Sequence, residues 1–334
     1  MNKSQFNRCP GHLGEGYDGY CNSCRQHLFD GKKVSYRLSF NYEAENNSLQ
    51  DNINQLSVSG VQEKLSAILS GNELRLTKPG EHGHYIIKPA PGYKYLRYRN
   101  QIPANEHLTM QIASQVFGIK TAMNGLIFSQ DGSPAYLTRR FDYDKTGKKI
   151  NQEDFASLAQ KTTLTHGKGF KYTGSYEDAA AILKENVSAW RVEMVRFFKL
   201  IVFNYIFGNG DAHLKNFSLQ QTYSGDYIMS PAYDLLNTSI HVNDEDFALK
   251  EGLMPEAVWS DVYSSTGHPC REDFVTFGNR IGGLPKKIEE VINEFSQENV
   301  RIKEMIENSY LDNRTKRMYL RLYHERLQRF LRGK

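Results

Sequence analysis

The sequence predicts an α+β protein of two lobes, with a strand-rich first lobe and a mainly helical second lobe. The chain has 334 residues. A chain of this length is usually too long to fold around a single hydrophobic core. Short apolar runs broken by turn residues fill residues 51 to 144, a pattern typical of strands and hairpins. Apolar residues at helical spacing dominate beyond residue 150. We therefore expect a head at residues 1–50, an N-lobe at 51–148 and a helical C-lobe at 149–334.

Composition is that of an ordinary globular protein, with 39% hydrophobic and 24% charged residues. No stretch approaches the roughly 18 apolar residues that a membrane span needs, and the N-terminus MNKSQFNRCPGH lacks the apolar core of a signal peptide. We therefore expect a cytoplasmic protein that does not associate with membranes. The net charge of +4 and the pI of about 8.6 permit an acidic partner such as RNA without requiring one.

Four residues near the N-terminus have the spacing of a metal site. The stretch CPGHLGEGYDGYCNSC has two residues between Cys9 and His12 and two between Cys21 and Cys24. Three thiolates and one imidazole suit a structural Zn²⁺. A turn-rich head with reduced cysteines and no metal is the alternative, because the loop between the two pairs is shorter than in most zinc fingers. Four cysteines in the whole chain, the last at Cys270, are too few for a disulfide framework.

The N-lobe is expected to consist of hairpins around one helix. Residues 25–50, which lead into it, are polar and predicted to be irregular apart from a short element around VSYRLSF. A hairpin should turn at Ser-Gly-Asn, residues 70–72, and HYIIKPA, 84–90, should form a strand. PANEHLTMQIASQVFG, 103–118, has helical spacing with a proline near its start and a glycine at its end. Residues 125–144 should form a second hairpin, turning at Asp-Gly.

The C-lobe is predicted to begin near residues 144 to 152 and to be mainly helical. Helices are expected over 153–161, 176–187 and 189–207, followed by two or three amphipathic helices after Lys286. The last of these, RTKRMYLRLYHERLQRFLRGK, is basic with an apolar stripe. Such a helix either binds a phosphate backbone or, as we favour, packs on the core and exposes a charged face.

The stretch GNGDAHLKNFSL, which follows the apolar run WRVEMVRFFKLIVFNYIF, holds the residues of a phosphoryl-transfer site. Asp211 can orient an attacking hydroxyl, and the amide oxygen of Asn216 can ligate Mg²⁺. Lys215 can offset charge on the transferred group, and His213 belongs to the same set. Asp234, in SPAYDLLNT, is a candidate second metal ligand. Singly, such residues are more often turn formers.

The first lobe supplies complementary residues in the required order. Ser57, Ser59 and Gly60, in SVSGVQEK, lie between two strand runs as a phosphate-covering loop would. Lys88 ends the next strong strand, and Glu106 on the following helix can pair with it. A surface lysine and a solvated glutamate are the alternatives for this pair. The ordered set favours a kinase-like site.

Together, the SVSGVQ loop and the segments YIIKP, NEH, RRFD, EDFASLAQ, GNGDAHLKNF and SPAYDLL closely resemble the HipA-like serine/threonine kinases of bacterial toxin–antitoxin modules. The resemblance runs from about residue 20 to the C-terminus and implies a two-lobed kinase-like fold that uses ATP and Mg²⁺. It implies that Asp211 is the catalytic base and that Asn216 and Asp234 bind Mg²⁺. The ATP-binding residues it implies are Ser57, Val58, Ser59, Gly60, Lys88, Glu106, Arg140 and Phe141, the last two at the adenine-facing hinge.

The resemblance also implies autophosphorylation at Ser57 or Ser59. A phosphoserine there would place about −1.5 to −2 charges where the ATP phosphates sit. The alternative is that small residues merely let the loop approach phosphate.

The implied function is that of a toxin that phosphorylates an aminoacyl-tRNA synthetase and so halts translation, with the tryptophanyl enzyme favoured and the glutamyl enzyme second. Because the phosphate loop begins at residue 57, the sequence resembles the short, HipT-like form. The partners of that form are a small protein resembling the missing N-terminal subdomain and a DNA-binding antitoxin, through which DNA is reached indirectly. Two alternatives remain, namely a small-molecule phosphotransferase similar to the aminoglycoside kinases, and a catalytically silent module that binds RNA or an antitoxin.

Overall fold

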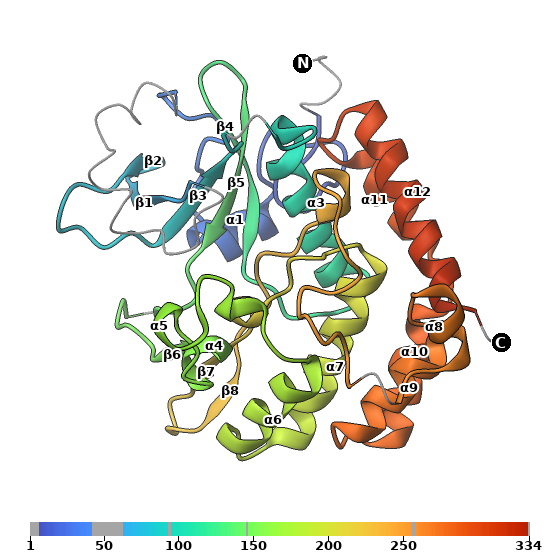
Figure 1. The fold of residues 1–334 in the computed structure, drawn as a ribbon. Helices are drawn as coiled ribbons and strands as arrows, with labels where there is room; N and C mark the ends of the chain where they lie inside the picture. Colours follow the sequence, from blue (N-terminus) through green and yellow to red (C-terminus); the bar gives the residue numbers. More distant parts are fainter. Residues whose placement is uncertain (1–6, 42–62, 93–94, 145, 256–257, 333–334) are drawn as a thin grey trace.

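The computed structural model describes residues 7–41, 63–92, 95–144, 146–255 and 258–332. Its first lobe contains a five-stranded antiparallel sheet of order β2-β1-β3-β5-β4 (Figure 1). The strands are β1 (Leu65–Ser70), β2 (Glu73–Leu76), β3 (Tyr85–Pro89), β4 (Asn124–Phe128) and β5 (Pro134–Arg139). Both predicted hairpins are present, as β1–β2 and β4–β5.

Lys88 of strand β3 points toward helix α3, where its Nζ donates to Glu106. Tyr85 and Ile87 are buried in a small core on one face of the sheet, so Lys88 lies on the other face because side chains alternate along a strand. Its neighbour across the sheet, Tyr136, belongs to the larger core on that face. Helix α3 (Ile102–Gln115) packs against β4 and β5 on the same side and is buried along most of its length.

The head covers the opposite face of the sheet. It contains a short helix, α1 (Asn22–Phe29), so the expectation of irregular structure from residue 25 is wrong as far as residue 29. This helix has eight residues, and only its last two are buried. Two buried positions are too few to give the sequence a helical period of apolar residues. Its packing on the sheet stabilises it, since Tyr85 donates a 2.8 Å hydrogen bond to the carbonyl of Leu28. Further on, VSYRLSF pairs with the edge of β4 through Arg37 and Phe128.

The second lobe contains the predicted long helices α6 (Tyr176–Asn186) and α7 (Trp190–Ile206). Its remaining α-helices are α4 (Phe155–Leu158), α5 (Thr163–His166), α8 (Asp261–Thr266), α9 (Arg271–Arg280), α10 (Pro285–Phe295), α11 (Val300–Asn308) and α12 (Asn313–Phe330). Short 3₁₀ turns include η3 (Phe170–Tyr172), η4 (Leu214–Asn216) and η5 (Thr238–Ile240).

A three-stranded sheet in this lobe corrects the prediction of helix over 153–161. Strands β6 (Gln152–Asp154), β7 (Ser218–Gln221) and β8 (Tyr227–Met229) pair antiparallel, and only the single turn α4 follows β6. Strands of three or four residues are too short to show alternation in a sequence. β7 directly follows η4, so this small sheet anchors the far end of the polar loop.

One large hydrophobic core joins α3, the sheet and the helices of the second lobe. Helix α12 runs along the outside of the molecule (Figure 1), and its Tyr319, Tyr323 and Phe330 are buried in that core. The apolar stripe of the basic terminal helix is therefore used in packing. Among the helices of the described residues, none is both long and apolar enough to cross a membrane.

Candidate active site

A cavity of about 280 Å³ that contains several charged side chains lies where the first lobe meets the segments that follow α7 and β8. Six residues predicted from the sequence line it, namely Lys88, Glu106, Asp211, His213, Asn216 and Asp234. They come from strand β3, helix α3, the loop after α7 and the segment after β8. The fold thus brings together residues that are up to 146 positions apart.

Lys88 is the centre of a buried charge cluster. Its Nζ donates to Glu106 Oε1 at 2.6 Å and to a carboxylate oxygen of Asp234. The side chains of Lys88 and Glu106 are only 4% and 1% exposed. Burial acts to lower the pKa of Lys88, but the two carboxylates outweigh burial and raise this pKa above its ordinary value. Burial raises the pKa of Glu106, with Lys88 opposing the shift.

Asp234 is held in an unusual conformation between three donors. Its φ of 56° is in the left-handed region, which non-glycine residues adopt at some cost and often at functional sites. Besides Lys88, its carboxylate faces Lys64 Nζ at 3.6 Å and Asn216 Nδ2 at 3.4 Å. Although burial acts to raise it, the pKa of Asp234 is held well below its ordinary value by Lys64 and Lys88.

Asp211 faces the cavity with half of its side chain exposed. Tyr172 donates a 2.8 Å hydrogen bond to its Oδ1. The pKa of Asp211 is raised because the cavity walls shield it from water, while the bond from Tyr172 lowers it. His213 Nε2 lies 4.0 Å from Asp211 Oδ2, and burial lowers the pKa of His213 to about 3. His213 is therefore neutral near pH 7.

The loop that carries Asp211 is held by the segment that follows Asp234. Helix α7 ends at Ile206, and Gly208, with a φ of 64°, turns the chain out of it. Thr238 Oγ1 accepts from the amide of Gly210 at 2.8 Å and donates to the carbonyl of Gly208 at 3.1 Å. The buried helix α7 thus gives the polar loop a rigid base, and Thr238 fixes its course.

The other predicted site residues do not line this cavity in the described part of the chain. Lys215 Nζ lies 3.6 Å from an oxygen of Asp154. Arg140 follows β5 and pairs with Asp142, while Phe141 packs its ring against Tyr233. Ser57, Val58, Ser59 and Gly60 lie outside the described residues, so their role remains a prediction.

Several cavity residues were not found from the sequence. Lys64 closes the SVSGVQEK stretch, so that stretch contained it without giving it a role. Lys171, Tyr172, Thr238 and Asp244 also line the cavity, and no motif distinguishes them. They reach the cavity only because the fold brings η3, η5 and the segment after η5 to it.

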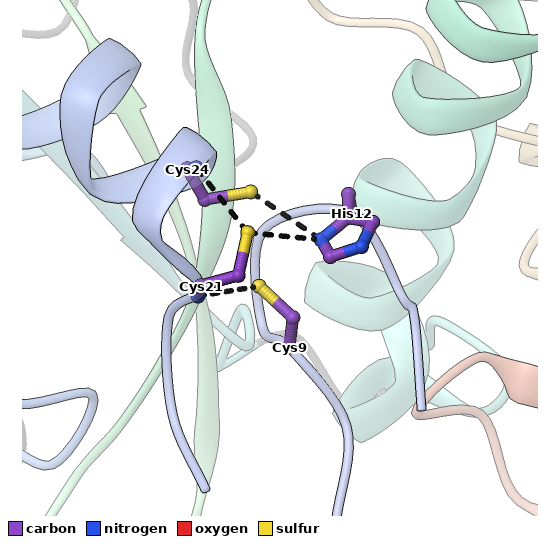
Figure 2. A group of neighbouring side chains, drawn as sticks. All are labelled: Cys9, His12, Cys21 and Cys24. Carbon is purple, nitrogen blue, oxygen red and sulfur yellow. Dashed lines mark hydrogen bonds between the residues drawn. The ribbon is translucent and has the colours of Figure 1, made fainter. Parts of the chain in front are cut away.

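The predicted metal residues of the head lie together (Figure 2). One ligand atom from each of Cys9, His12, Cys21 and Cys24 lies within 4.8 Å of all the others. All four cysteines of the chain are free of disulfides. The spacing of the two Cys/His pairs therefore predicted this cluster correctly, and the cluster has the donors to hold a metal ion.

The fold is that of kinase-like proteins. The toxin HipA of Shewanella oneidensis MR-1, solved with HipB and operator DNA, superposes with a TM-score of 0.58 at 21% identity, covering 82% of this chain and 64% of that one. The proinflammatory kinase CtkA of Helicobacter pylori superposes with a TM-score of 0.50 at 16% identity, covering 80% of this chain and 90% of that one. At these identities the likeness concerns the fold alone.

Sequence comparison then assigns the family. The family model of the HipA-like C-terminal domain matches residues 56–302, so the chain belongs to the HipA-like C-terminal domain family. A Haemophilus influenzae protein named "Putative kinase" is 27% identical over 331 residues, which cover 94% of this chain and 93% of that protein. The resemblance seen in the motifs is therefore confirmed at the level of the family.

The cavity fits the ATP and Mg²⁺ that a kinase-like fold implies. Mg²⁺ prefers oxygen ligands, and Asp234 offers carboxylate oxygens beside the side-chain amide of Asn216. The Asn216 amide now donates its nitrogen to Asp234 and accepts from the His213 amide through Oδ1, so it would have to turn to offer that oxygen to the metal. Lys64 and Lys88 supply positive charge on the same wall, suited to phosphates. Asp211 lines the same cavity with half of its side chain exposed.

Proposed function

We propose that this protein is an ATP- and Mg²⁺-dependent serine/threonine protein kinase. The observation that carries the proposal is the convergence of the Lys88–Glu106 pair with Asp211, Asn216 and Asp234 on one cavity. A packed structural cluster would not need a half-exposed carboxylate in the same cavity as a buried lysine–glutamate pair. Phosphoryl transfer needs both.

Each residue has a role that follows from its surroundings. Lys88, held by Glu106, would contact the ATP phosphates, and Asn216 and Asp234 would hold Mg²⁺. The metal supplies neutralisation of phosphate charge when bound. Asp211 would orient the acceptor hydroxyl and take its proton, and its raised pKa makes it a better base than a free carboxylate. Tyr172 would fix the rotamer of Asp211 through the 2.8 Å bond.

The remaining parts of the site are proposed from the family. Arg140 and Phe141 would lie on the adenine side, and His213 and Lys215 would support the catalytic loop. Ser57 or Ser59 would be the site of autophosphorylation, since phosphate on that loop would compete with the phosphates of ATP.

We also propose that the kinase is the toxin of a toxin–antitoxin module. The likeness to a HipA solved with HipB and operator DNA supports an antitoxin partner. The protein would be the short, HipT-like form and would work with a small partner protein. Its substrate would be an aminoacyl-tRNA synthetase, first the tryptophanyl and second the glutamyl enzyme, and modification would halt translation in the cytoplasm.

The test is phosphate transfer from γ-labelled ATP in the presence of Mg²⁺, using purified protein freed of existing phosphate. The wild-type chain and an Asp211→Ala variant are incubated in separate reactions with each synthetase, and labelled peptides are mapped by mass spectrometry. We expect label on Ser57 or Ser59 and on one synthetase, and none with Asp211→Ala. Label confined to a small alcohol would identify a small-molecule phosphotransferase. Absence of all label would overturn the proposal in favour of a silent binding module.

A further inference from the structure

We infer that Cys9, His12, Cys21 and Cys24 bind one Zn²⁺, and that this metal site holds helix α3, and with it the Lys88–Glu106 pair, in position. The effect on catalysis depends on the proposed kinase function. The metal site and its contacts with α3 do not depend on that function.

The distances within the cluster are those of a tetrahedral zinc site. Cys21 Sγ and Cys24 Sγ lie 3.6 Å and 3.5 Å from the same atom, His12 Nδ1 (Figure 2). Zinc bonds of about 2.3 Å to sulfur and 2.05 Å to nitrogen at tetrahedral angles place S and N about 3.6 Å apart. A ring nitrogen carries at most one hydrogen, so hydrogen bonding explains one such contact better than two.

The backbone around the cluster stabilises thiolates. Cys9 Sγ accepts from the amides of Gly11 and Cys21 at 3.4 Å and 3.2 Å, and Cys21 Sγ accepts from the amide of Cys24 at 3.4 Å. Amide donors to ligand sulfurs are the outer-shell contacts that orient metal ligands. The bonds to Cys9 and Cys21 also fix the loop before the ion arrives.

Two glycines permit the close approach. A Cβ on Gly11 would lie 2.5 Å from Cys24 Sγ, and a Cβ on Gly14 would lie 2.4 Å from His12 Nε2. Both distances are far inside van der Waals contact, so a side chain at either position would displace a ligand. The glycines of the stretch CPGHLG therefore serve the cluster.

The loop between Cys9 and His12 is bonded directly to α3 and to the sheet. The carbonyl of Gly11 accepts from His107 Nε2 at 2.9 Å, and the carbonyl of His12 accepts from Gln115 Nε2 at 3.1 Å. The amide of Leu126, in β4, donates to the carbonyl of Pro10 at 2.9 Å. Contacts at both His107 and Gln115 hold α3 along two of its turns.

Three consecutive residues of α3 connect this loop to the candidate active site. His107 donates to the metal loop, and Glu106 accepts from Lys88 at 2.6 Å. Asn105 donates at 2.8 Å to the carbonyl of Asn237, three residues beyond Asp234. All three side chains are essentially inaccessible to solvent. A shift of α3 would therefore move Glu106 away from Lys88 and loosen the segment that carries Asp234.

Metal content tests the first half of the proposal. The full chain, purified without added metal and then equilibrated with Zn²⁺, is analysed by mass spectrometry of metals, and with Co²⁺ in place of Zn²⁺ by visible absorption. We expect about one ion per chain and the intense d–d bands of tetrahedral Co²⁺. Cys24→Ser should lose the ion, whereas Cys24→His should keep it with shifted bands. Cys270→Ser, a cysteine outside the cluster, is the matched control and should keep one ion.

Two results would overturn the metal site. One is a wild-type chain that takes up less than about a tenth of an equivalent of Zn²⁺ or Co²⁺. The other is a Cys24→Ser variant that still binds one equivalent with unchanged Co²⁺ bands.

Hydrogen exchange tests the effect on α3. In metal-free protein, the amides of α3 should exchange at least about tenfold faster than in the zinc form, while those of α9 should not change. Affinity for a fluorescent ATP analogue should fall in parallel. His107→Ala should reproduce both effects with the ion still bound, and His107→Gln, which can donate to Gly11, should restore protection.

The outcomes separate the hypotheses. If removal of the ion unfolds the whole chain, seen as loss of far-ultraviolet dichroism, the metal-loaded His107→Ala variant carries the test. Unchanged exchange in α3 for this variant would refute the coupling. Zinc-loaded wild type that protects α3 yet transfers no phosphate would refute the proposed kinase function alone.

Discussion

Replacing Lys88 by methionine should lower the free energy of unfolding, because it removes the cation from the buried charge cluster. The substitution keeps the approximate shape of the side chain and leaves Glu106 and Asp234 facing each other without the shared cation. Removing one partner of a buried ion pair costs about 3–5 kcal/mol of unfolding free energy. Asp234 retains Lys64 at 3.6 Å, so we expect a loss near the lower end of this range.

The variant should also acquire a distinct pH dependence. The pKa of Glu106 is already raised by burial, and Lys88 is the main group that opposes this shift. Without Lys88 the pKa of Glu106 in the folded state rises further. Folded protein then keeps a proton on Glu106 at pH values above about 4.3, where Glu106 of the unfolded chain has released it. Stability should therefore fall as pH rises through the folded-state pKa, by up to about 1.4 kcal/mol per pH unit. Adding Glu106→Gln removes this proton and should recover much of the loss.

Urea unfolding followed by the fluorescence of Trp190 and Trp259 measures these changes between pH 5 and 8. Lys199→Met is the control, because Lys199 and Glu294 form a partly exposed pair whose loss should cost no more than about 1 kcal/mol. The reasoning is refuted if Lys88→Met loses no more than this control. It is equally refuted if the double variant is no more stable than the single one.

Three further predictions concern the same site and the head. Tyr172→Phe removes a bond that lowers the pKa of Asp211, so the acid limb of the pH–rate profile for phosphate transfer should move to higher pH; an unmoved limb would contradict Asp211 as the titrating base. The lowered pKa of Asp234 contributes stability that is present above the unfolded-state pKa of about 3.9 and is lost as pH falls below that value. Asp234→Asn should therefore flatten the decline of the urea midpoint below pH 4. An equal decline in both proteins would count against this ion network. Gly11→Ala should lower Zn²⁺ content by displacing Cys24 Sγ, and full occupancy measured by metal analysis would show that the loop can yield.

The local sequence determined much of the candidate active site. Alternation in YIIKP places Lys88 on the face of β3 opposite Tyr85 and Ile87, and helical spacing in 103–118 predicts the helix that presents Glu106. The spacing of Asp211 and Asn216 on one loop is likewise a local property. The Cys/His spacing of the head predicted its cluster for the same reason, because each pair lies within a single turn of chain.

Only the tertiary structure decided which distant residues meet. Tyr172 reaches Asp211 from η3, and Lys64 reaches Asp234 from the residue before β1. No sequence pattern gave either of them a role. The strands of the small sheet are too short for periodicity to show, and α1 is stabilised by the sheet beneath it. The docking of the head on α3 depends on bonds such as His107 to Gly11, 96 residues apart. Periodicity determines which face a side chain occupies, whereas the packing of the whole core determines what that face meets.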